Sequence, residues 1–181
     1  MNWLSLGALI FAAMLVFWGI GAYHRLMRLR AAIVKAFAQI EHHHQQRAEL
    51  CDRLVAAVRP ALPDEPATFD ALATARDDVQ DAMQAARAKP HAGGPVAQLA
   101  VVSAVHVSAL TRLLSLIDHH AELRHDAAVY GLLEELKLVE RQRSFARQVF
   151  NQAVAQYNEA QAQFPTRILA GLYGISEARS L

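Results

Sequence analysis

Histidine is the residue type in this chain most able to do chemistry, because nine of the 181 residues are histidines. They concentrate in two stretches, Glu41–Gln46 (EHHHQQ) and Ile117–Asp126 (IDHHAELRHD). Both stretches mix imidazoles with carboxylates, and these side chains are ligands of zinc and copper. The first question is therefore whether their spacing suits a metal ion.

The spacing within the two stretches suits a metal only in part. Ligands of one ion on a helix lie three or four residues apart. Glu41 and His44 meet this condition, whereas His120 lies two residues before Glu122 and five before His125. The favoured interpretation is therefore a hydrated polar helix face, with no metal and no cofactor, and a zinc or copper site is the alternative.

Other reactive side chains show no catalytic pattern. His106 lies on or beside an apolar stripe, where a satisfied core histidine is favoured over a proton-sensitive residue. Cys51 is the single cysteine, so no internal disulfide can form, and it is expected to pack as a small apolar residue. No serine has a nucleophile-elbow motif, and no glycine-rich loop follows a strand. We expect no enzymatic activity and no small-molecule substrate.

The charge pattern also argues against a nucleic-acid partner. The net charge is +1, so no overall field favours polyanions. Basic residues alternate with acidic residues along the helices, which is typical of a solvated face.

Two asparagines are further candidates for binding. Asn151 and Asn158 are seven residues apart and share one helix face, and Gln148 is a possible third member. Either these amides bond to a neighbouring helix, or they form a ridge that binds a partner.

The elements that position these residues are predicted to be helices only. Arg25–Arg59 contains no Gly or Pro, and its apolar residues recur at three- and four-residue steps, which predicts one buried stripe. Breaks are predicted at Pro60–Pro66, where Asp64 or Thr68 caps the next helix, and at Lys89–Pro95. A third helix is expected over Val96–Leu123.

The last predicted helix, Ala127–Gln163 with Asp126 as its cap, has the most regular pattern. Large residues alternate with alanines, so that two helix backbones can approach closely. Arg143 interrupts this pattern of apolar residues, and its side chain should find a carboxylate partner or reach solvent. With no strand signals, the fold class is all-α: an elongated antiparallel four-helix bundle over residues 25–164. The two seven-residue series are Val129, Leu136, Arg143, Phe150, Tyr157 and Phe164, and Leu132, Val139, Ala146, Ala153 and Ala160.

The N-terminus is predicted to be a transmembrane anchor, residues 1–24, whose helix continues into the bundle. Asn2–Tyr23 contains no charged residue, and 22 helical residues rise about 33 Å, which matches a bilayer core. A cleaved signal peptide fits less well, because no basic residue precedes the apolar run. Positive charge at its C-terminal end predicts a single pass with the N-terminus outside and the rest cytoplasmic. The interfacial residues are Trp3, Trp18, Tyr23, Arg25, Arg28 and Arg30.

The C-terminal tail, residues 165–181, is predicted to be apolar and close to the membrane. Pro165 should end the last helix at Phe164, and an antiparallel bundle returns that helix to the membrane end of the first. The tail then lies at the bilayer interface or, alternatively, plugs the open end of the bundle. The residues expected to touch the bilayer are Ile168, Leu169, Leu172 and Tyr173.

The last helix and its tail resemble the LemA family of bacterial membrane proteins. The resemblance rests on four pairs or blocks and a final turn: Phe145-Ala146-Arg147-Gln148, Phe150-Asn151, Tyr157-Asn158, Phe164-Pro165 and Ala170-Gly171-Leu172. Tyr23–Arg30 and Arg47–Val55 resemble the family's segments after the anchor and in the first helix.

Four residues depart from the family pattern. Asp52 and Arg53 stand where proline and asparagine are expected, His24 replaces an asparagine, and Arg143 replaces an apolar residue. These changes indicate a divergent member with altered surface contacts.

The resemblance implies a single-pass protein of the bacterial inner membrane with little chemistry. One branch of the family resembles a protein needed to build magnetosome membranes, and other members lie beside genes for membrane proteases. We therefore expect a structural or adaptor protein whose partners are the lipid bilayer and either a second copy or another membrane protein. The alternative is an envelope-stress sensor or a modulator of a membrane protease.

Overall fold

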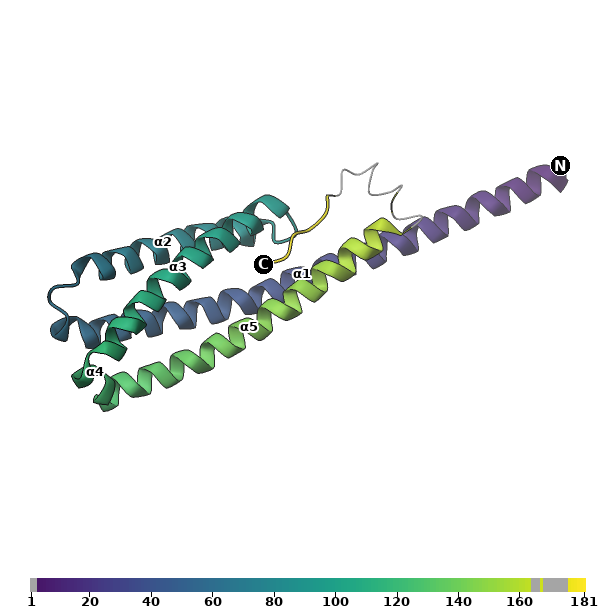
Figure 1. Ribbon diagram of the computed structural model, residues 1–181. Coiled ribbons are helices and arrows are strands. Elements are labelled where there is room, and N and C mark those ends of the chain that lie inside the picture. The colour runs from purple at the N-terminus through teal and green to yellow at the C-terminus, as the bar shows by residue number, and fades with distance from the viewer. Residues whose placement is uncertain (1–2, 164–166, 168–175) are drawn as a thin grey trace.

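The computed structural model describes residues 3–163, 167 and 176–181, and this part of the chain is helical without any β-strand (Figure 1). The all-α prediction is confirmed. The elements are α1 (Trp3–Val58), the 3-10 turn η1 (Arg59–Ala61), α2 (Pro66–Ala88), α3 (Gly93–His119), α4 (Ala121–His125) and α5 (Ala127–Ala162).

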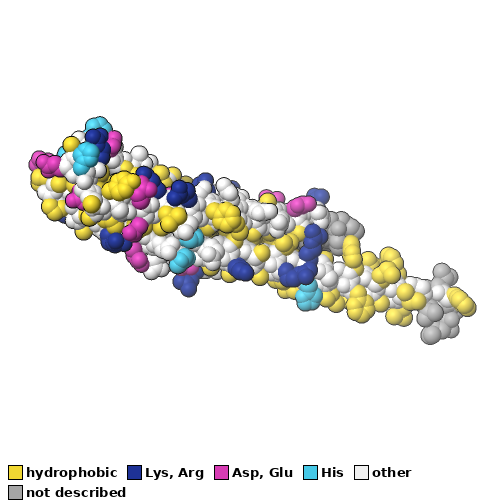
Figure 2. Space-filling view, turned by 90° about the horizontal axis from the view of Figure 1, so that it is seen from below, with side chains coloured by type: hydrophobic (Ala, Val, Ile, Leu, Met, Phe, Trp, Pro, Cys, Tyr) yellow, Lys and Arg dark blue, Asp and Glu magenta, His cyan; other side chains and the backbone are white. Residues whose placement is uncertain are grey.

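Helix α1 is a single unbroken helix of 56 residues, as the absence of Pro and Gly after residue 21 predicts. Its first part extends beyond the rest of the molecule (Figure 1) and shows an apolar surface in Figure 2. Leu26 is only 1% exposed and marks where α1 enters the core. One helix therefore joins the apolar N-terminal segment rigidly to the packed domain.

The helices form two antiparallel pairs, and the predicted four-helix bundle is not confirmed. α1 packs along α5 and α2 packs along α3, and these are the two extensive helix contacts in the part of the chain described here. Contacts that run from Arg25 with Gln163 to Arg53 with Glu135 establish the antiparallel order of α1 and α5. Among the described residues, α3 and α5 have no comparably extensive contact.

Helix ends follow local chemistry, with two corrections to the predictions. Asp126 caps α5 as predicted, since its Oδ1 accepts from the N–H groups of Ala128 and Val129 at 2.8 and 2.9 Å. Neither Asp64 nor Thr68 caps α2; Glu65 precedes Pro66, and the Thr68 hydroxyl donates to the Glu65 carboxylate.

The predicted third helix, Val96–Leu123, is too long. It ends at His119 because His120 is extended (φ −100°, ψ 105°), and the short α4 follows. The break turns Leu123 into the core, where it is 5% exposed.

Two apolar clusters make up the core, one at each end of the packed domain. The cluster nearer the N-terminal segment ends at Ile40 on α1 and includes Phe37 and Phe150, whose rings meet edge to face at 6.0 Å. The distal cluster begins at Leu50 on α1. The two predicted series on α5 supply both clusters, and all their described members except the half-buried Arg143 are buried.

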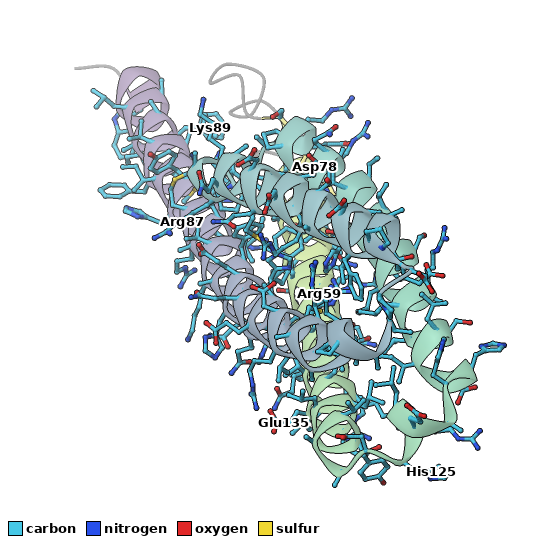
Figure 3. The ribbon with its side chains drawn as sticks, turned by 90° about the vertical axis from the view of Figure 1, so that its left-hand side faces the viewer. Arg59, Asp78, Arg87, Lys89, His125 and Glu135 are labelled. Atoms are coloured by element: carbon cyan, nitrogen blue, oxygen red, sulfur yellow. The ribbon has the colours of Figure 1, made fainter. Side chains whose placement is uncertain are left out.

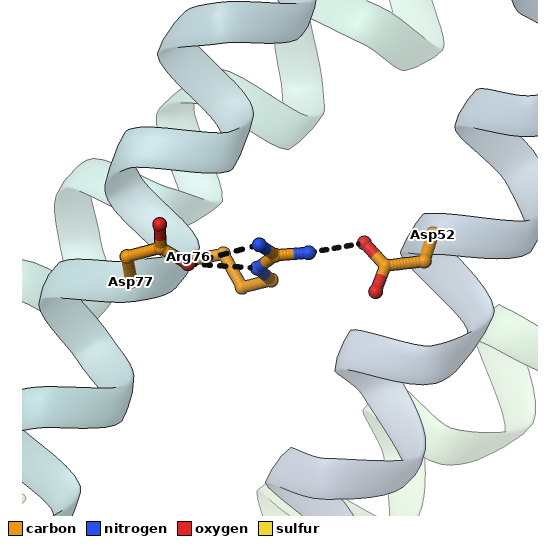
Figure 4. A network of polar contacts seen from close by, with 3 residues as sticks. All are labelled: Asp52, Arg76 and Asp77. Carbon is orange, nitrogen blue, oxygen red and sulfur yellow. Dashed lines mark hydrogen bonds and ion pairs between the residues drawn. The ribbon is translucent and has the colours of Figure 1, made fainter.

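Exposed ion pairs join neighbouring helices at the surface of the domain. Asp52 accepts from Arg76 on α2 at 2.7 Å, and Arg76 also bonds to Asp77 (Figure 4). Arg53 pairs with Glu135 on α5, and Glu41 pairs with Arg87 on α2; Figure 3 labels Glu135 and Arg87. Two departures from the family pattern, Asp52 and Arg53, thus form cross-helix pairs. Exposed pairs of this kind contribute about 0–1 kcal/mol each.

Candidate functional site

A buried layer of charged and polar side chains separates the two apolar clusters. Its centre is Arg47 of α1, which is 1% exposed. The Arg47 Nη1 donates to Nδ1 of His106 on α3 at 2.6 Å, and its Nε lies 2.5 Å from Oε1 of Glu140 on α5. The second contact is an ion pair whose angles fall outside hydrogen-bond geometry. Three helices therefore meet at one guanidinium, and we call Arg47, His106, His44, Glu140 and Arg143 the polar layer.

The two histidines of the layer are held neutral. Arg47 is a donor only, so His106 Nδ1 accepts and the proton of the neutral ring is on Nε2. Burial, with Arg47 next in importance, lowers the pKa of His106 to about 3. Burial and then Arg47 and Arg143 lower the pKa of His44 to about 4. His106 is therefore a neutral core histidine, as favoured from the sequence, but it is satisfied only at Nδ1, because its buried Nε2 has no hydrogen-bond partner among the described residues.

Positive charge exceeds negative charge in this layer. Arg143 is 21% exposed, and its Nε lies 3.5 Å from Oε2 of Glu140, so the prediction of a carboxylate partner is confirmed. Burial and then Arg47 lower the pKa of Arg143. Two guanidiniums share one carboxylate while both histidines are neutral, which leaves one net positive charge.

Four members of the layer, His44, Arg47, Glu140 and Arg143, line a groove between α3 and α5, which we call the α3–α5 groove. Its proximal hollow is about 660 Å³ and its distal hollow about 630 Å³. Val107 and Glu140 line both hollows, so the groove is continuous. The α3 wall is mostly small in the proximal hollow and mostly large and apolar in the distal one, whereas the α5 wall carries charged residues in both.

The end of the groove beyond the proximal hollow is filled by residues 176–181, the C-terminal segment, and both predicted asparagines bind it. Asn158 donates to the Ala178 carbonyl at 2.8 Å and accepts from the Ala178 N–H at 2.9 Å. Asn151 makes the same two bonds with Leu181, both at 2.9 Å. Neither alternative from the sequence, a neighbouring helix or a partner, anticipated this contact within the chain.

The spacing of the two asparagines matches an extended peptide. Seven helical residues rise about 10.5 Å, and three extended residues span about 10 Å. Ala178 is 4% exposed, and Leu181 packs against the proximal cluster and lines the proximal hollow. A Cβ placed on Gly93 would lie 3.1 Å from Arg179 Cγ, so the segment also touches the start of α3. It therefore runs antiparallel to α5 and bridges the two helix pairs (Figure 1).

We predict that replacing both Asn151 and Asn158 with Ala releases the C-terminal segment. Four half-buried hydrogen bonds are lost, at about 1 kcal/mol each. Amide hydrogen exchange of Ala178 and Leu181 should accelerate at least tenfold, while exchange in α5 stays slow. Gln148→Ala on the exposed side of α5 is the matched control and should leave both amides protected. Protected amides in the double variant would contradict the prediction.

The predicted histidine clusters do not assemble. Among the residues that the structure places, no three His, Cys, Asp or Glu side chains are positioned to hold a metal ion. His119 and His120 donate from Nδ1 to the carbonyls of Ser115 and Leu116 within α3, and His125 projects from the far end of the molecule (Figure 3).

Burial raises the pKa of the Cys51 thiol to about 11, so this thiol stays protonated.

The residues predicted at the membrane interface lie on the exposed first part of α1. Trp3, Trp18 and Tyr23 are 93%, 44% and 44% exposed. Arg28 is exposed, and basic side chains gather where the apolar segment meets the packed domain (Figure 2). By length and composition α1 can cross a membrane, with its apolar window unburied, and so can α3, which buries one face.

Two of the interfacial arginines also join elements of the domain. Arg25 donates to Gln163 at 3.2 Å, which confirms that the last helix returns to the N-terminal segment. Arg30 donates to His91, in the joint between α2 and α3, at 2.7 Å.

The remaining predicted residues divide between the described and undescribed parts of the chain. Phe145, Arg147 and Gln148 are exposed on α5, and Tyr157 is buried. The tail is predicted to lie close to the membrane, and its described part, residues 176–181, packs against the domain through Ala178 and Leu181. The others lie outside the described residues: Phe164, Pro165, Ile168, Leu169, Gly171, Leu172 and Tyr173.

Sequence reasoning missed Arg47 and Glu140. A signal was present, because His44 and Arg47 continue the three- and four-residue steps of the α1 stripe between Ile40 and Leu50. Polar residues at buried positions of a stripe indicate a polar layer, but their partners come from helices far away in the sequence.

No curated protein matches the chain. The family model described as the LemA family matches residues 36–181, which is most of the chain and includes every residue of the polar layer and both groove asparagines. The resemblance seen in the α5 motifs is thereby confirmed, and this protein belongs to the LemA family.

Proposed function

We propose that this protein is a membrane-anchored structural or adaptor protein that self-associates or recruits a partner at the cytoplasmic face of the bacterial inner membrane. The observation that carries the proposal is the continuity of α1, which is exposed and apolar at its start and a core helix from Leu26 onward. A helix without a hinge holds the domain at a fixed distance and orientation from the bilayer. That property suits a scaffold.

The proposed topology follows from charge. Arg25, Arg28 and Arg30 come directly after the apolar segment, and basic residues at one end of a span favour the cytoplasmic side. The N-terminus then faces outward and the domain inward.

An exposed apolar stripe on α5 supports the interaction role. Leu138, Phe145 and Val149 are 48%, 67% and 40% exposed, and their spacings of seven and four residues place them on one helix face. This face is turned away from the α3–α5 groove. An apolar ridge beside charged neighbours is typical of a protein contact surface.

Cross-linking in membranes tests the proposal. A membrane-impermeant amine cross-linker should yield oligomers or a stable heteromeric product in inverted membrane vesicles, and none in right-side-out spheroplasts. Phe145→Asp should reduce the product at least fivefold without changing helix content, because the side chain is exposed. Tyr130→Asp, an exposed aromatic on α5 outside the stripe, is the matched control. Monomer alone in inverted vesicles would refute the association role, and products in spheroplasts would refute the topology.

A further inference from the structure

The α3–α5 groove is open where the C-terminal segment ends. That segment fills the end nearest the N-terminal part of α1, and Leu181 lines the proximal hollow. Beyond Leu181 the groove continues between α3 and α5 through both hollows. Its α5 wall extends from Arg147 to Leu133, which is about 21 Å of helix and the length of about six extended residues.

The chemistry of the open part differs from that of the filled end. Its floor is apolar: Leu99 and Met83 lie in the proximal hollow, and Leu110, Ile117 and Leu136 lie in the distal one. Its rim is basic, with Arg143 and Arg147 beside one hollow and Arg124, Lys137 and Arg141 beside the other. The acidic groups facing the groove are Glu140 and Asp118, and Glu140 is already shared by Arg47 and Arg143.

Two of the rim arginines are available to a ligand. Arg141 and Arg147 are exposed, and within the described part of the chain neither has an acidic group at ion-pair distance. Together with the uncompensated charge of the polar layer below, they give the open groove an excess of positive charge. An occupant with negative charge is therefore favoured on electrostatic grounds.

The filled end indicates the form of the occupant. There, side-chain amides of one α5 face bind an extended backbone antiparallel to the helix. Ser144 is the next residue on that face, seven positions before Asn151, and it lines the proximal hollow. In an extended chain alternate side chains point to opposite sides, so apolar residues would face the floor while acidic residues face the rim.

We propose that the open α3–α5 groove binds an extended segment of a partner protein in which acidic and apolar residues alternate, running on from the C-terminal segment in the same direction. This inference rests on the proposed adaptor function and names its docking site. It places recruitment in the groove, on a face separate from the stripe at Leu138, Phe145 and Val149. Recognition combines burial of apolar side chains with charge pairing at the rim.

Fluorescence anisotropy on the full chain in nanodiscs of zwitterionic lipid tests this. The probe is a fluorescein-labelled octapeptide of alternating Leu and Asp, with empty nanodiscs as the background. Saturable binding is expected, and the Leu-Lys octapeptide should bind at least tenfold more weakly. Raising the salt concentration should weaken the Leu-Asp peptide, because charge pairs are screened.

Variants locate the binding. Arg141→Met with Arg147→Met removes one exposed charge beside each hollow and should weaken binding at least tenfold. Lys35→Met with Arg112→Met removes the same charge from exposed positions outside the groove and should leave binding unchanged. Because all four side chains are exposed, folding is preserved, and circular dichroism checks this.

Three results would overturn the proposal: no binding above that of empty nanodiscs, equal affinity for the Leu-Lys peptide, or unchanged binding in the Arg141/Arg147 variant. A fourth result would also contradict a foreign partner: if the peptide lowered the yield of cross-linked oligomers of the protein, the groove would bind a second copy. If the peptide fails to bind but cross-linked products still form in inverted vesicles, the groove is not the docking site and the adaptor function stands. Absence of cross-linked products would remove the adaptor function itself.

Discussion

Replacing Glu140 with Gln should lower the free energy of unfolding by about 3 kcal/mol, the low end of the range for breaking a buried ion pair. Glu140 is the one carboxylate that the described residues place against both Arg47 and Arg143. Its loss leaves the Arg47 guanidinium, which is 1% exposed, without a counter-charge. The cost stays near the low end because the Glu140 side chain is 36% exposed and water can partly replace it. Urea unfolding followed by circular dichroism measures the difference.

Two comparisons separate this effect from a general loss of helix stability. Glu134→Gln makes the same substitution on the same helix and removes an exposed pair with Lys137, so it should leave the free energy of unfolding nearly unchanged. Arg47→Met combined with Glu140→Gln removes both charges and should be more stable than the sum of the single effects by about 1–2 kcal/mol. Additive effects would show that the two side chains do not interact.

The helices of this fold could be predicted because their signals are local. Three- and four-residue steps predict α1 from Leu26 onward, an uncharged apolar run predicts its first part, and Asp126 lies directly before the apolar pattern of α5. The end of α3 could not be predicted, because no comparable local signal marks it. The residues between Ile117 and Leu123 (DHHAE) are mostly polar, but they include no Pro or Gly to show that the chain turns at His120.

The candidate site could be predicted only in part, because its contacts are not local. Asn151 and Asn158 stand out by spacing, but their partner is an extended segment with no periodicity of its own. Arg47 contacts residues 59 and 93 positions away, on α3 and α5. The four-helix bundle is not confirmed, for a related reason. Each helix shows one apolar face, and this does not reveal that α3 and α5 stay apart around a polar layer and a docked segment.

The stability of the protein should fall as the pH is lowered from 6.5 toward 4, because His106 and His44 must stay neutral in the fold. An unfolded histidine has a pKa near 6.5, whereas burial and Arg47 lower the pKa values to about 3 for His106 and about 4 for His44. Between these values the unfolded chain binds more protons, so acid favours unfolding. Protonating His106 would also set a cation against Arg47, with only Glu140 to offset both Arg47 and Arg143.

Each histidine should therefore contribute a loss of about 2 kcal/mol between pH 6.5 and pH 5, at about 1.4 kcal/mol per pH unit. Urea unfolding at several pH values between 7.5 and 5 measures the slope. His106→Gln keeps an acceptor for Arg47 Nη1 but cannot take up a proton, so the slope should drop by about one proton, whereas the exposed His42→Gln should keep the slope of the parent protein. Equal slopes for all three proteins would show that His106 is already protonated in the folded state. A protonated His106 would raise the positive charge of the layer beneath the α3–α5 groove above what Arg47 and Arg143 alone provide. A second negative charge beside Glu140 would then be needed to balance it.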